Sequence, residues 1–401
     1  MKRRLGMACI LILLLILITG CWSRRELNEL GIVVGMGIDK SGDQYLVSFQ
    51  VVDPGEVAAK QGATGRAPVV MYKEESDTLF EAIRKITTIS PRRSYFSHLR
   101  ILVIGEELAK EGIGKSLEMI FRDHEFRTDF YIVVTKATKA EDVLRVITPL
   151  EKIPANHLFY SLQASEQTWA PMTTTVTLDQ LISDIVSEGK HPVLTGLQVQ
   201  GDKKAAETKD NAEEIESPGH LQYVQLAAFK KDRLVGWLNV EESGAYNYIQ
   251  NNVHNTVHQV PCSKGGKAVV ELLRSQTNLK GGVTNGKPQI DVNIQAEGNV
   301  AEVGCGNLDL SKPETIDELE TEINQSIKDS IEASIEKVQE RVKADIFGFG
   351  EAIRRSDPQA WKELKGDWDQ AFQDLPVTVK VDVKIRRVGT VGETFLSELK
   401  E

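Results

Sequence analysis

Residues 313–346 read PETIDELETEINQSIKDSIEASIEKVQERVKADI, and this stretch decides the architecture of the C-terminal half of the chain. Apolar residues recur in steps of three or four over thirty residues, at Ile316, Leu319, Ile323, Ile327, Ile331, Ile335, Val338, Val342 and Ile346. This spacing is typical of one face of an α-helix, and Pro313 suits its first turn. The pattern predicts one long helix whose apolar face lies along a sheet or a partner.

The segments on either side of this helix supply the sheet. Residues 257–276 and 289–303 alternate polar and apolar side chains, and Asn285-Gly286 between them is a strong hairpin signal. After the helix, Gly348 and Gly350 interrupt the pattern, Pro358 begins a shorter helix, and residues 377–388 form a last strand. We therefore expect residues 220–401 to be an α+β domain, with an antiparallel sheet packed on one long helix.

The N-terminal half alternates short strands with helices. Strands are expected at 32–38, 45–52, 99–104, 130–135 and 193–199, and helices at 77–89, 108–121, 140–147 and 178–186. Such alternation indicates a mixed sheet with helices on it. Residues 21–200 are thus an N-terminal α/β region with room for two subdomains, and the charged segment 201–219 is expected to be a linker or loop at the domain boundary.

Residues 1–20 have the features of a secretory signal peptide. Lys2, Arg3 and Arg4 precede an aliphatic run, and residues 17–21 read LITGC. This ending resembles the lipobox of bacterial lipoproteins, in which the cysteine, here Cys21, receives a diacylglyceryl group. A bare transmembrane anchor is the alternative, although the apolar run is shorter than the roughly 20 residues that a span needs. Lipidation of Cys21 would anchor the remaining chain outside the cytoplasm at a membrane surface.

The net charge of the chain after the signal peptide, residues 21–401 and here called the body, argues against some classes of partner. The chain has 48 basic and 58 acidic residues, and removal of residues 1–20 takes away three cations, which leaves a formal charge of −13. An acidic body gains nothing from counterion release on a polyphosphate. Nucleic acid is therefore not an expected partner, and direct docking of the body on anionic lipid is disfavoured by its net charge.

Two cysteines remain after the signal peptide and the lipidation site are set aside. The midpoint of Cys262 and Cys305 falls just before Asn285-Gly286, so a hairpin would bring the two thiols opposite each other. An extracytoplasmic compartment allows a disulfide to persist. We predict a disulfide, with two independent buried thiols as the alternative.

Four stretches together resemble one family. They are CWSRRELNELGIVVGMGIDK at 21–40, LVGWLNVEESGAY at 234–246, ADIFGFGEAIRRSDPQAW at 344–361 and VTVKVDVKIRRVGTV at 377–391. They resemble the Ger(x)C family, the lipoprotein C subunits of the nutrient receptors that trigger germination of bacterial spores. The resemblance implies a peripheral lipoprotein on the outer face of the inner spore membrane, which assembles with membrane A and B subunits and has no catalytic activity.

No constellation of catalytic or cofactor-binding residues stands out. Gly114-Lys115-Ser116 lacks the first glycine of a phosphate-binding loop, because Ala109 occupies that position. His254 and His258 are four residues apart, yet no third ligand accompanies them, so a metal site is not expected. No serine lies in a Gly-x-Ser-x-Gly frame. We expect neither an enzyme nor a bound cofactor.

Aromatic and basic residues cluster after the long helix. Aromatic residues at this density are typical either of a protein interface or of a core where a helix meets a sheet. The candidate partner contacts are Phe347, Phe349, Arg354, Arg355 and Trp361.

The sequence therefore predicts a lipid-anchored subunit that acts through protein contacts. The alternative is an extracytoplasmic lipoprotein that itself binds a small nutrient, which would need a closed polar pocket between domains.

Overall fold

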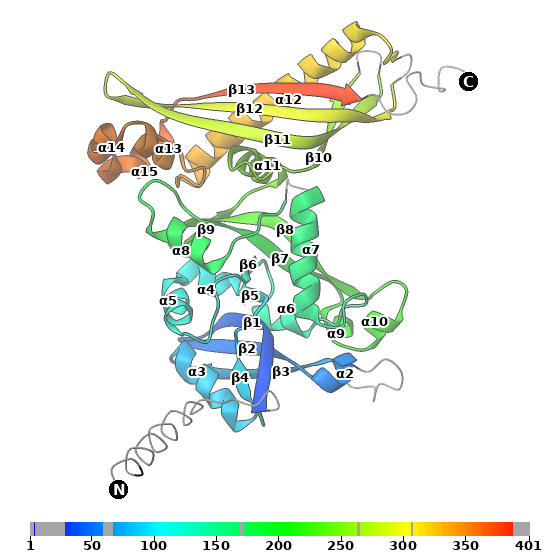
Figure 1. Ribbon diagram of the computed structural model, residues 1–401, viewed down its shortest axis with the longest axis vertical. Coiled ribbons are helices and arrows are strands. Elements are labelled where there is room, and N and C mark those ends of the chain that lie inside the picture. Colours follow the sequence, from blue (N-terminus) through cyan, green and yellow to red (C-terminus); the bar gives the residue numbers. More distant parts are fainter. Residues whose placement is uncertain are drawn as a thin grey trace.

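The computed structural model describes residues 4, 29–58, 67–168, 172–262, 265–305 and 308–387. Two β-sheets follow one another along the long axis of the molecule, each with its own helices (Figure 1). The mixed α/β fold class is as predicted.

The first sheet has nine strands. They are β1 (Leu30–Ser41), β2 (Gln44–Val52), β3 (Val69–Ser76), β4 (Arg93–Tyr95), β5 (Ile101–Ile104), β6 (Tyr131–Thr135), β7 (Val193–Gly201), β8 (Gly219–Lys230) and β9 (Arg233–Trp237). Their order is β3-β2-β1-β5-β6-β7-β8-β9, with β4 also paired to β1. The central strands β1, β5, β6 and β7 are parallel, and antiparallel pairs flank them. The sheet is therefore mixed, as the alternation of strands and helices predicts.

Helices cover both faces of this sheet. They are α2 (Pro54–Ala58), α3 (Leu79–Lys85), η2 (Ile86–Thr88), α4 (Glu106–Glu111), α5 (Gly114–Arg122), α6 (Ala140–Arg145), α7 (Pro154–Thr168), α8 (Leu178–Val186), α9 (Lys203–Ala206) and α10 (Asp210–Glu213). One buried cluster joins the sheet to α3, α4, α5 and α8, and another joins it to α6 and α7. The helix expected at 108–121 is two helices, because Gly112 adopts a φ of 134° between them.

Residues 201–219, where the sequence predicts a linker or loop at a domain boundary, lie between two paired strands. β7 and β8 lie on either side of this segment and pair with each other, from Val193–Ala228 to Gly201–Gly219. The segment contains α9 and α10, and buried Asn211 ties it down by donating to the Ile147 carbonyl at 2.6 Å and accepting from the Gly219 N–H at 2.9 Å. It is a connection within the first sheet, which continues to Trp237.

The second sheet has four strands in sequence order. They are β10 (Thr256–Pro261), β11 (Lys267–Thr284), β12 (Lys287–Val303) and β13 (Val377–Arg387). Asn285 and Gly286 form the β11–β12 turn with φ values of 53° and 76°, as the hairpin signal predicts. The expected arm 257–276 is instead two antiparallel strands, because Gly265 and Gly266 turn the chain with φ values of 90° and 84°.

The prediction of an antiparallel second sheet holds for β10–β11–β12 and is wrong for β13. β13 runs parallel to β12, from Val377 opposite Ile290 to Arg387 opposite Asn299. The helices between these strands return the chain to the end of the sheet where β12 began, and such a crossover makes the next strand parallel.

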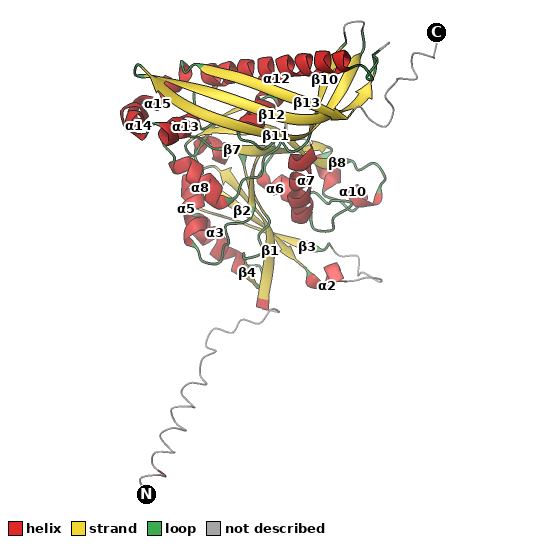
Figure 2. Ribbon diagram, turned by 45° about the horizontal axis from the view of Figure 1, so that its top comes forward, coloured by secondary structure: helices red, strands yellow, loops and turns green. Residues whose placement is uncertain are grey.

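The long helix predicted from the apolar repeat is α12, and it lies along the second sheet (Figure 2). The first sheet with its helices is here called the first unit, and the second sheet with its helices the second unit. The helices of the second unit are α11 (Val240–Ile249), α12 (Pro313–Arg341), α13 (Phe349–Ser356), α14 (Pro358–Leu364), η3 (Lys365–Asp367) and α15 (Trp368–Gln373). Residues of the α12 repeat from Leu319 to Val338 are buried. The helix ends at Arg341, earlier than predicted, because Lys343 takes a left-handed φ of 54°.

In the described part of the chain, no helix is both long enough and apolar enough to span a bilayer.

Candidate functional site at the junction of the two sheets

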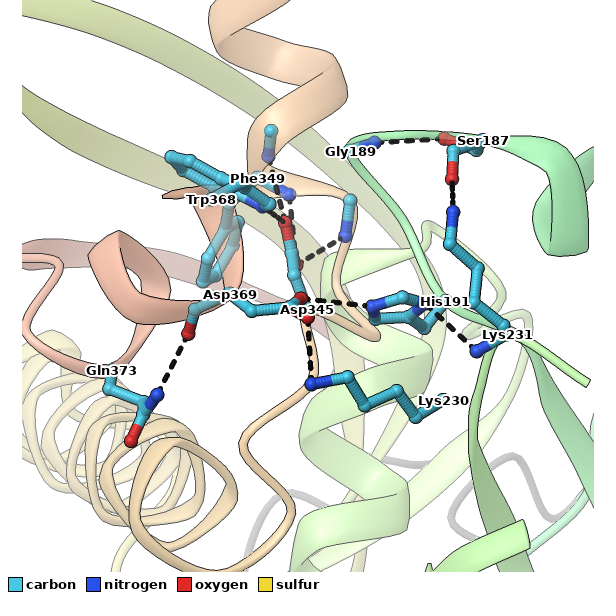
Figure 3. Close-up of polar contacts among 12 residues, drawn as sticks. Ser187, Gly189, His191, Lys230, Lys231, Asp345, Phe349, Trp368, Asp369 and Gln373 are labelled. Atoms are coloured by element: carbon cyan, nitrogen blue, oxygen red, sulfur yellow. Dashed lines mark hydrogen bonds and ion pairs between the residues drawn. The ribbon is translucent and has the colours of Figure 1, made fainter. Parts of the chain in front are cut away.

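The loop between α12 and α13 is organised by Asp345, which is fully buried. Its carboxylate accepts the backbone N–H groups of Gly348, Phe349 and Gly350 at 2.9, 3.1 and 2.8 Å, and the indole N–H of Trp368 at 3.0 Å (Figure 3). A carboxylate at these N–H groups satisfies the unpaired donors at the start of α13. Gly348 completes the turn because its φ of 74° suits glycine.

Two opposing effects set the protonation of Asp345. Burial disfavours the charged carboxylate, while the four N–H donors favour it. Burial is the stronger effect, and it raises the pKa of Asp345 to about 6. The loop that joins α12 to α13 therefore holds a carboxyl group that titrates in mildly acidic solution.

The same loop contacts the first sheet through backbone atoms. The His191 N–H donates to the Asp345 carbonyl at 2.7 Å, and the Glu351 N–H donates to the Gly189 carbonyl at 3.2 Å. Gly189 and Gly350 also lie against each other, because a Cβ added to Gly189 would stand 2.7 Å from the carbonyl carbon of Gly350. Side chains at either glycine would push the two units apart.

His191 links the β8–β9 turn to α15. Its Nδ1 accepts the Lys231 backbone N–H at 3.2 Å, and its Nε2 lies 3.2 Å from Asp369 Oδ1 (Figure 3). An acceptor at Nδ1 and a carboxylate at Nε2 assign the neutral tautomer with the proton on Nε2. Burial lowers the pKa of the His191 imidazole, and Asp369 only partly opposes this effect.

Asp369 receives a second partner from the first sheet. The Nζ of Lys230 lies 2.7 Å from Asp369 Oδ2. Partial burial tends to raise the pKa of Asp369, but the hydrogen bonds from Lys230 and His191 outweigh it and hold that pKa below its ordinary value. One carboxylate of α15 thus binds two cationic or donor groups of the first unit.

A further ion pair joins α12 to α11. Arg341 binds the buried Glu242 carboxylate at 2.5 Å through Nη2 and the Trp237 carbonyl at 3.1 Å through Nη1. Glu242 also completes the capping box of α11 with Asn239. Together with the contacts of Asp345 and Asp369, this pair couples the last strand of the first sheet to the helices of the second unit.

The junction borders a pocket of about 430 Å³. It is lined by Glu188, His191, Lys230, Lys231, Lys365, Gly366, Asp367, Trp368, Asp369, Gln370 and Gln373. Lys365 pairs with Glu188 at 3.0 Å and Lys230 with Asp369, so these charges of the lining neutralise one another. In the described residues, no group of three or more His, Cys, Asp or Glu side chains is placed to hold a metal ion.

The predicted partner contacts divide into two groups. Phe347, Phe349 and Trp361 are 1%, 0% and 3% exposed and pack where α13, α14 and α15 meet the second sheet, which favours the core alternative for these aromatic residues. Arg354 and Arg355 are exposed on α13, and Arg354 pairs with Glu351 at 2.6 Å. Of the five candidate contacts, only the two arginines are exposed.

Cys262 and Cys305 form a disulfide, with Cα atoms 6.1 Å apart. Cys262 lies in the β10–β11 turn and not on a long strand, so the bond ties that turn to the chain just after β12. The predicted lipidation site Cys21 lies outside the described residues.

The two weaker motifs have ordinary structural roles. The Asp232 carboxylate accepts the Gly114 N–H at 3.1 Å, so a carboxylate already occupies the start of α5 where a phosphate would bind. His258 Nε2 lies 2.6 Å from the Tyr248 hydroxyl, and burial lowers the pKa of this imidazole to about 4. His254 is exposed, in the bend before β10.

Known proteins match the chain along almost its whole length. Residues 23–199 match the family described as "Spore germination protein N-terminal domain", and residues 225–389 match "Spore germination B3/GerAC like, C-terminal". Spore germination protein KC of Bacillus subtilis is 32% identical over 409 aligned positions that cover 100% of both chains. The chain belongs to the Ger(x)C family of spore germination proteins.

Other Ger(x)C relatives are more distant. Spore germination protein B3 of Bacillus subtilis is 23% identical, over 96% of this chain and 98% of its own. The crystal structure of the GerBC protein superposes with a TM-score of 0.54 and 20% identity, over 88% of this chain and 96% of that one. This likeness supports the two-sheet fold.

Sequence reasoning missed the polar residues of the junction in this Ger(x)C chain. Asp345 had a local signal, since it stands three residues before Gly348 in ADIFGFG, the spacing of a side-chain cap. His191 and Asp369 had none, because they are 178 residues apart and meet only when both units are folded.

Proposed function

We propose that this chain is the lipid-anchored C subunit of a spore nutrient germinant receptor. In this role it is held by acyl chains on Cys21 at the outer face of the inner spore membrane, and it assembles with the membrane A and B subunits. It works through protein contacts and carries out no reaction of its own. The observation that carries the proposal is the full-length similarity to spore germination protein KC.

The junction supports this role physically. A subunit that transmits contacts between partners needs two units held in one arrangement, and the backbone bonds of His191 and Glu351 provide such a connection. Because the chain is anchored at Cys21, the body stays close to the membrane subunits, and its local concentration near them is raised. The exposed arginines Arg354 and Arg355 offer a surface for one of these partners.

Replacement of the lipidated residue tests the proposal. We expect Cys21→Ala spores to lose the protein from the inner membrane fraction, to lose its crosslinks to the A and B subunits, and to respond poorly to the nutrient. A conservative control is Cys9→Ala, which changes a cysteine of the predicted signal peptide and leaves the acceptor thiol intact. Normal germination by the Cys21→Ala strain, with the protein soluble, would contradict the proposal.

A nutrient-binding lipoprotein is the second candidate, favoured by the pocket at the junction. The pocket is bordered by both units, but several of its charges are already paired within the protein. Calorimetry with candidate nutrients on the purified protein separates the two functions. Saturable heat that disappears in a Lys230→Ala variant would favour direct nutrient binding.

A further inference from the structure

A strongly basic segment stands out in an acidic protein. Between Ala82 and Gly105 the chain has five Lys and Arg residues and no Asp or Glu, whereas the body after Cys21 carries a formal charge of −13. Electrostatic attraction at a surface depends on charges within about 8 Å at physiological salt, so a local cluster can act against the sign of the whole body.

The cluster surrounds a hollow of about 560 Å³ on the first unit. The hollow, here called the basic hollow, is lined by Arg84, Thr87, Ser90, Pro91, Arg92 and Arg93. The hydroxyl of Thr87 donates to the Arg84 carbonyl at 2.6 Å and that of Ser90 to the Arg92 carbonyl at 2.8 Å. These bonds fix the backbone of η2 and the following turn, and Arg84, Arg92 and Arg93 are exposed residues.

Two of these arginines have no acidic partner among the described residues. Lys85 pairs with Glu81 and Arg93 with Glu125, at 3.2 and 2.5 Å. Arg84 lies over the ring of Phe80, 4.6 Å from its centroid, and Arg92 makes no ion pair within the described ranges. A planar guanidinium group without a carboxylate is suited to bidentate binding of a phosphate.

The position of the hollow relates it to the predicted lipid anchor. β4 pairs with the start of β1, with Arg93 opposite Leu30, and a Cβ added to Gly31 would lie 3.5 Å from Arg92 Cβ. Eight residue steps separate Cys21 from Glu29, and at roughly 3.6 Å per residue they span at most about 29 Å. The basic hollow therefore lies at the end of the body that the tether holds near the membrane, and α12 lies at the opposite end (Figure 1).

Exposed apolar side chains lie beside the cations. Ile89, directly after η2, is 51% exposed, and Phe80 on α3 is 45% exposed. Apolar side chains next to Lys and Arg are typical of surfaces that lie in the headgroup region of a bilayer.

We propose that the basic hollow binds the phosphate groups of anionic phospholipids in the leaflet that holds the acyl chains of Cys21. The inference rests on the lipid anchor of the proposed function, and it adds the orientation of the protein relative to the bilayer. Contact at both Cys21 and the hollow directs β4 and η2 toward the bilayer and the second sheet away from it. Each arginine near an anionic surface changes the population in contact by about five-fold.

The experiment uses the mature, acylated protein in vesicles that contain no other protein. A fluorophore is attached at Ile89→Cys in one preparation and at Val257→Cys, on β10 of the second unit, in another. Because Cys262 and Cys305 are bonded to each other, the introduced thiol is labelled selectively. Quenching by lipids with a nitroxide near the headgroup is measured in phosphatidylglycerol-containing and in pure phosphatidylcholine vesicles.

We expect quenching at Ile89→Cys in the anionic vesicles, about five-fold or more weaker contact in the neutral ones, and no quenching at Val257→Cys. The double substitution R84E/R92E should reduce the contact at least about five-fold, whereas the matched change R354E/R355E on α13 leaves it unaltered. Equal quenching in both kinds of vesicle, or no effect of R84E/R92E, would overturn the inference. A response of the Ile89→Cys probe to inorganic phosphate without vesicles would also overturn it, in favour of a soluble ligand.

The acyl mass on Cys21 is verified in each preparation before the quenching is measured. A missing acyl group counts against the lipid anchor itself, while an acylated protein without quenching at Ile89→Cys counts against the basic hollow alone.

Discussion

The backbone N–H of His191 donates to the backbone carbonyl of Asp345 at 2.7 Å, and this bond joins the residues before β7 in the first sheet to the loop after α12 in the second unit. The Asp345 side chain meanwhile caps α13. Asp345 thus both caps α13 and attaches the loop after α12 to the first sheet. Changes to the Asp345 carboxyl should therefore affect both units together.

Asp345→Asn should lower the free energy of unfolding by about 1–3 kcal/mol, because one amide oxygen replaces two carboxylate oxygens that accept four N–H groups. Urea denaturation of both proteins at pH 7 measures the difference. Asp374→Asn, at an exposed position of the same unit, is the matched control and should change the stability little. Equal stability of wild type and Asp345→Asn would show that the cap is dispensable.

The stability difference between wild type and Asp345→Asn should grow in acid. The folded-state pKa of Asp345 is raised to about 6, above its ordinary value near 3.8, so between these values the folded state binds the proton and the unfolded state does not. The stabilisation that the folded state gains from this proton is fully present below pH 3.8 and is lost as the pH rises through 6. We expect the gap to widen by about 2–3 kcal/mol from pH 7 to pH 4. A gap that narrows on acidification would mean that the N–H donors hold the carboxylate charged.

His191 should be neutral at pH 6.5 in the folded protein, with its proton on Nε2. Burial lowers its pKa, and Nδ1 is already occupied by the Lys231 N–H. Long-range proton–nitrogen correlation spectra identify the tautomer, and the same residue in the urea-unfolded chain, half protonated near pH 6.5, serves as the reference. Two protonated ring nitrogens in the folded protein at this pH would contradict the assignment.

Removal of the disulfide with Cys262→Ser/Cys305→Ser should cost about 2–4 kcal/mol of stability, because the bond closes a loop of 43 residues. Unfolding of the wild type with and without a reducing agent should show the same loss. Free thiols in protein isolated from spores, detected by alkylation and mass spectrometry, would show that the bond does not form there.

Arg355→Glu should reduce germination while the fold is retained, since this arginine is exposed on α13 and its charge is available to a partner. Lys337→Glu reverses an exposed charge on α12 and is the matched control. Nutrient-triggered loss of spore refractility measures the response, and circular dichroism measures the fold. Equal germination by the two variants would show that the charge of Arg355 on α13 does not contribute to a partner contact.

The sequence predicts elements whose signal is local and periodic. The apolar repeat from Leu319 to Val338, in steps of three or four residues, specifies α12, and Asn285-Gly286 specifies the β11–β12 hairpin. It does not predict the direction of β13, which depends on where α12 to α15 return the chain. The parallel order of the first sheet and the pairing of β7 with β8 across 201–219 are likewise properties of the assembled sheet.

The candidate site was even less accessible to sequence reasoning. Aromatic residues such as Phe349 are equally suited to a core and an interface, and only the observed burial decides between them. His191, Lys230 and Asp369 form one cluster from three distant segments, so no spacing in the sequence marks them. Asp345 alone lies in a recognisable capping pattern.

The mass of the mature polypeptide from spore membranes tests the central claim most directly. If this chain is a lipid-anchored receptor subunit, the polypeptide begins at Cys21, and its N-terminal peptide carries the added mass of a diacylglyceryl group. A mature chain that begins at another residue, or a Cys21 peptide without acyl mass, would contradict the account.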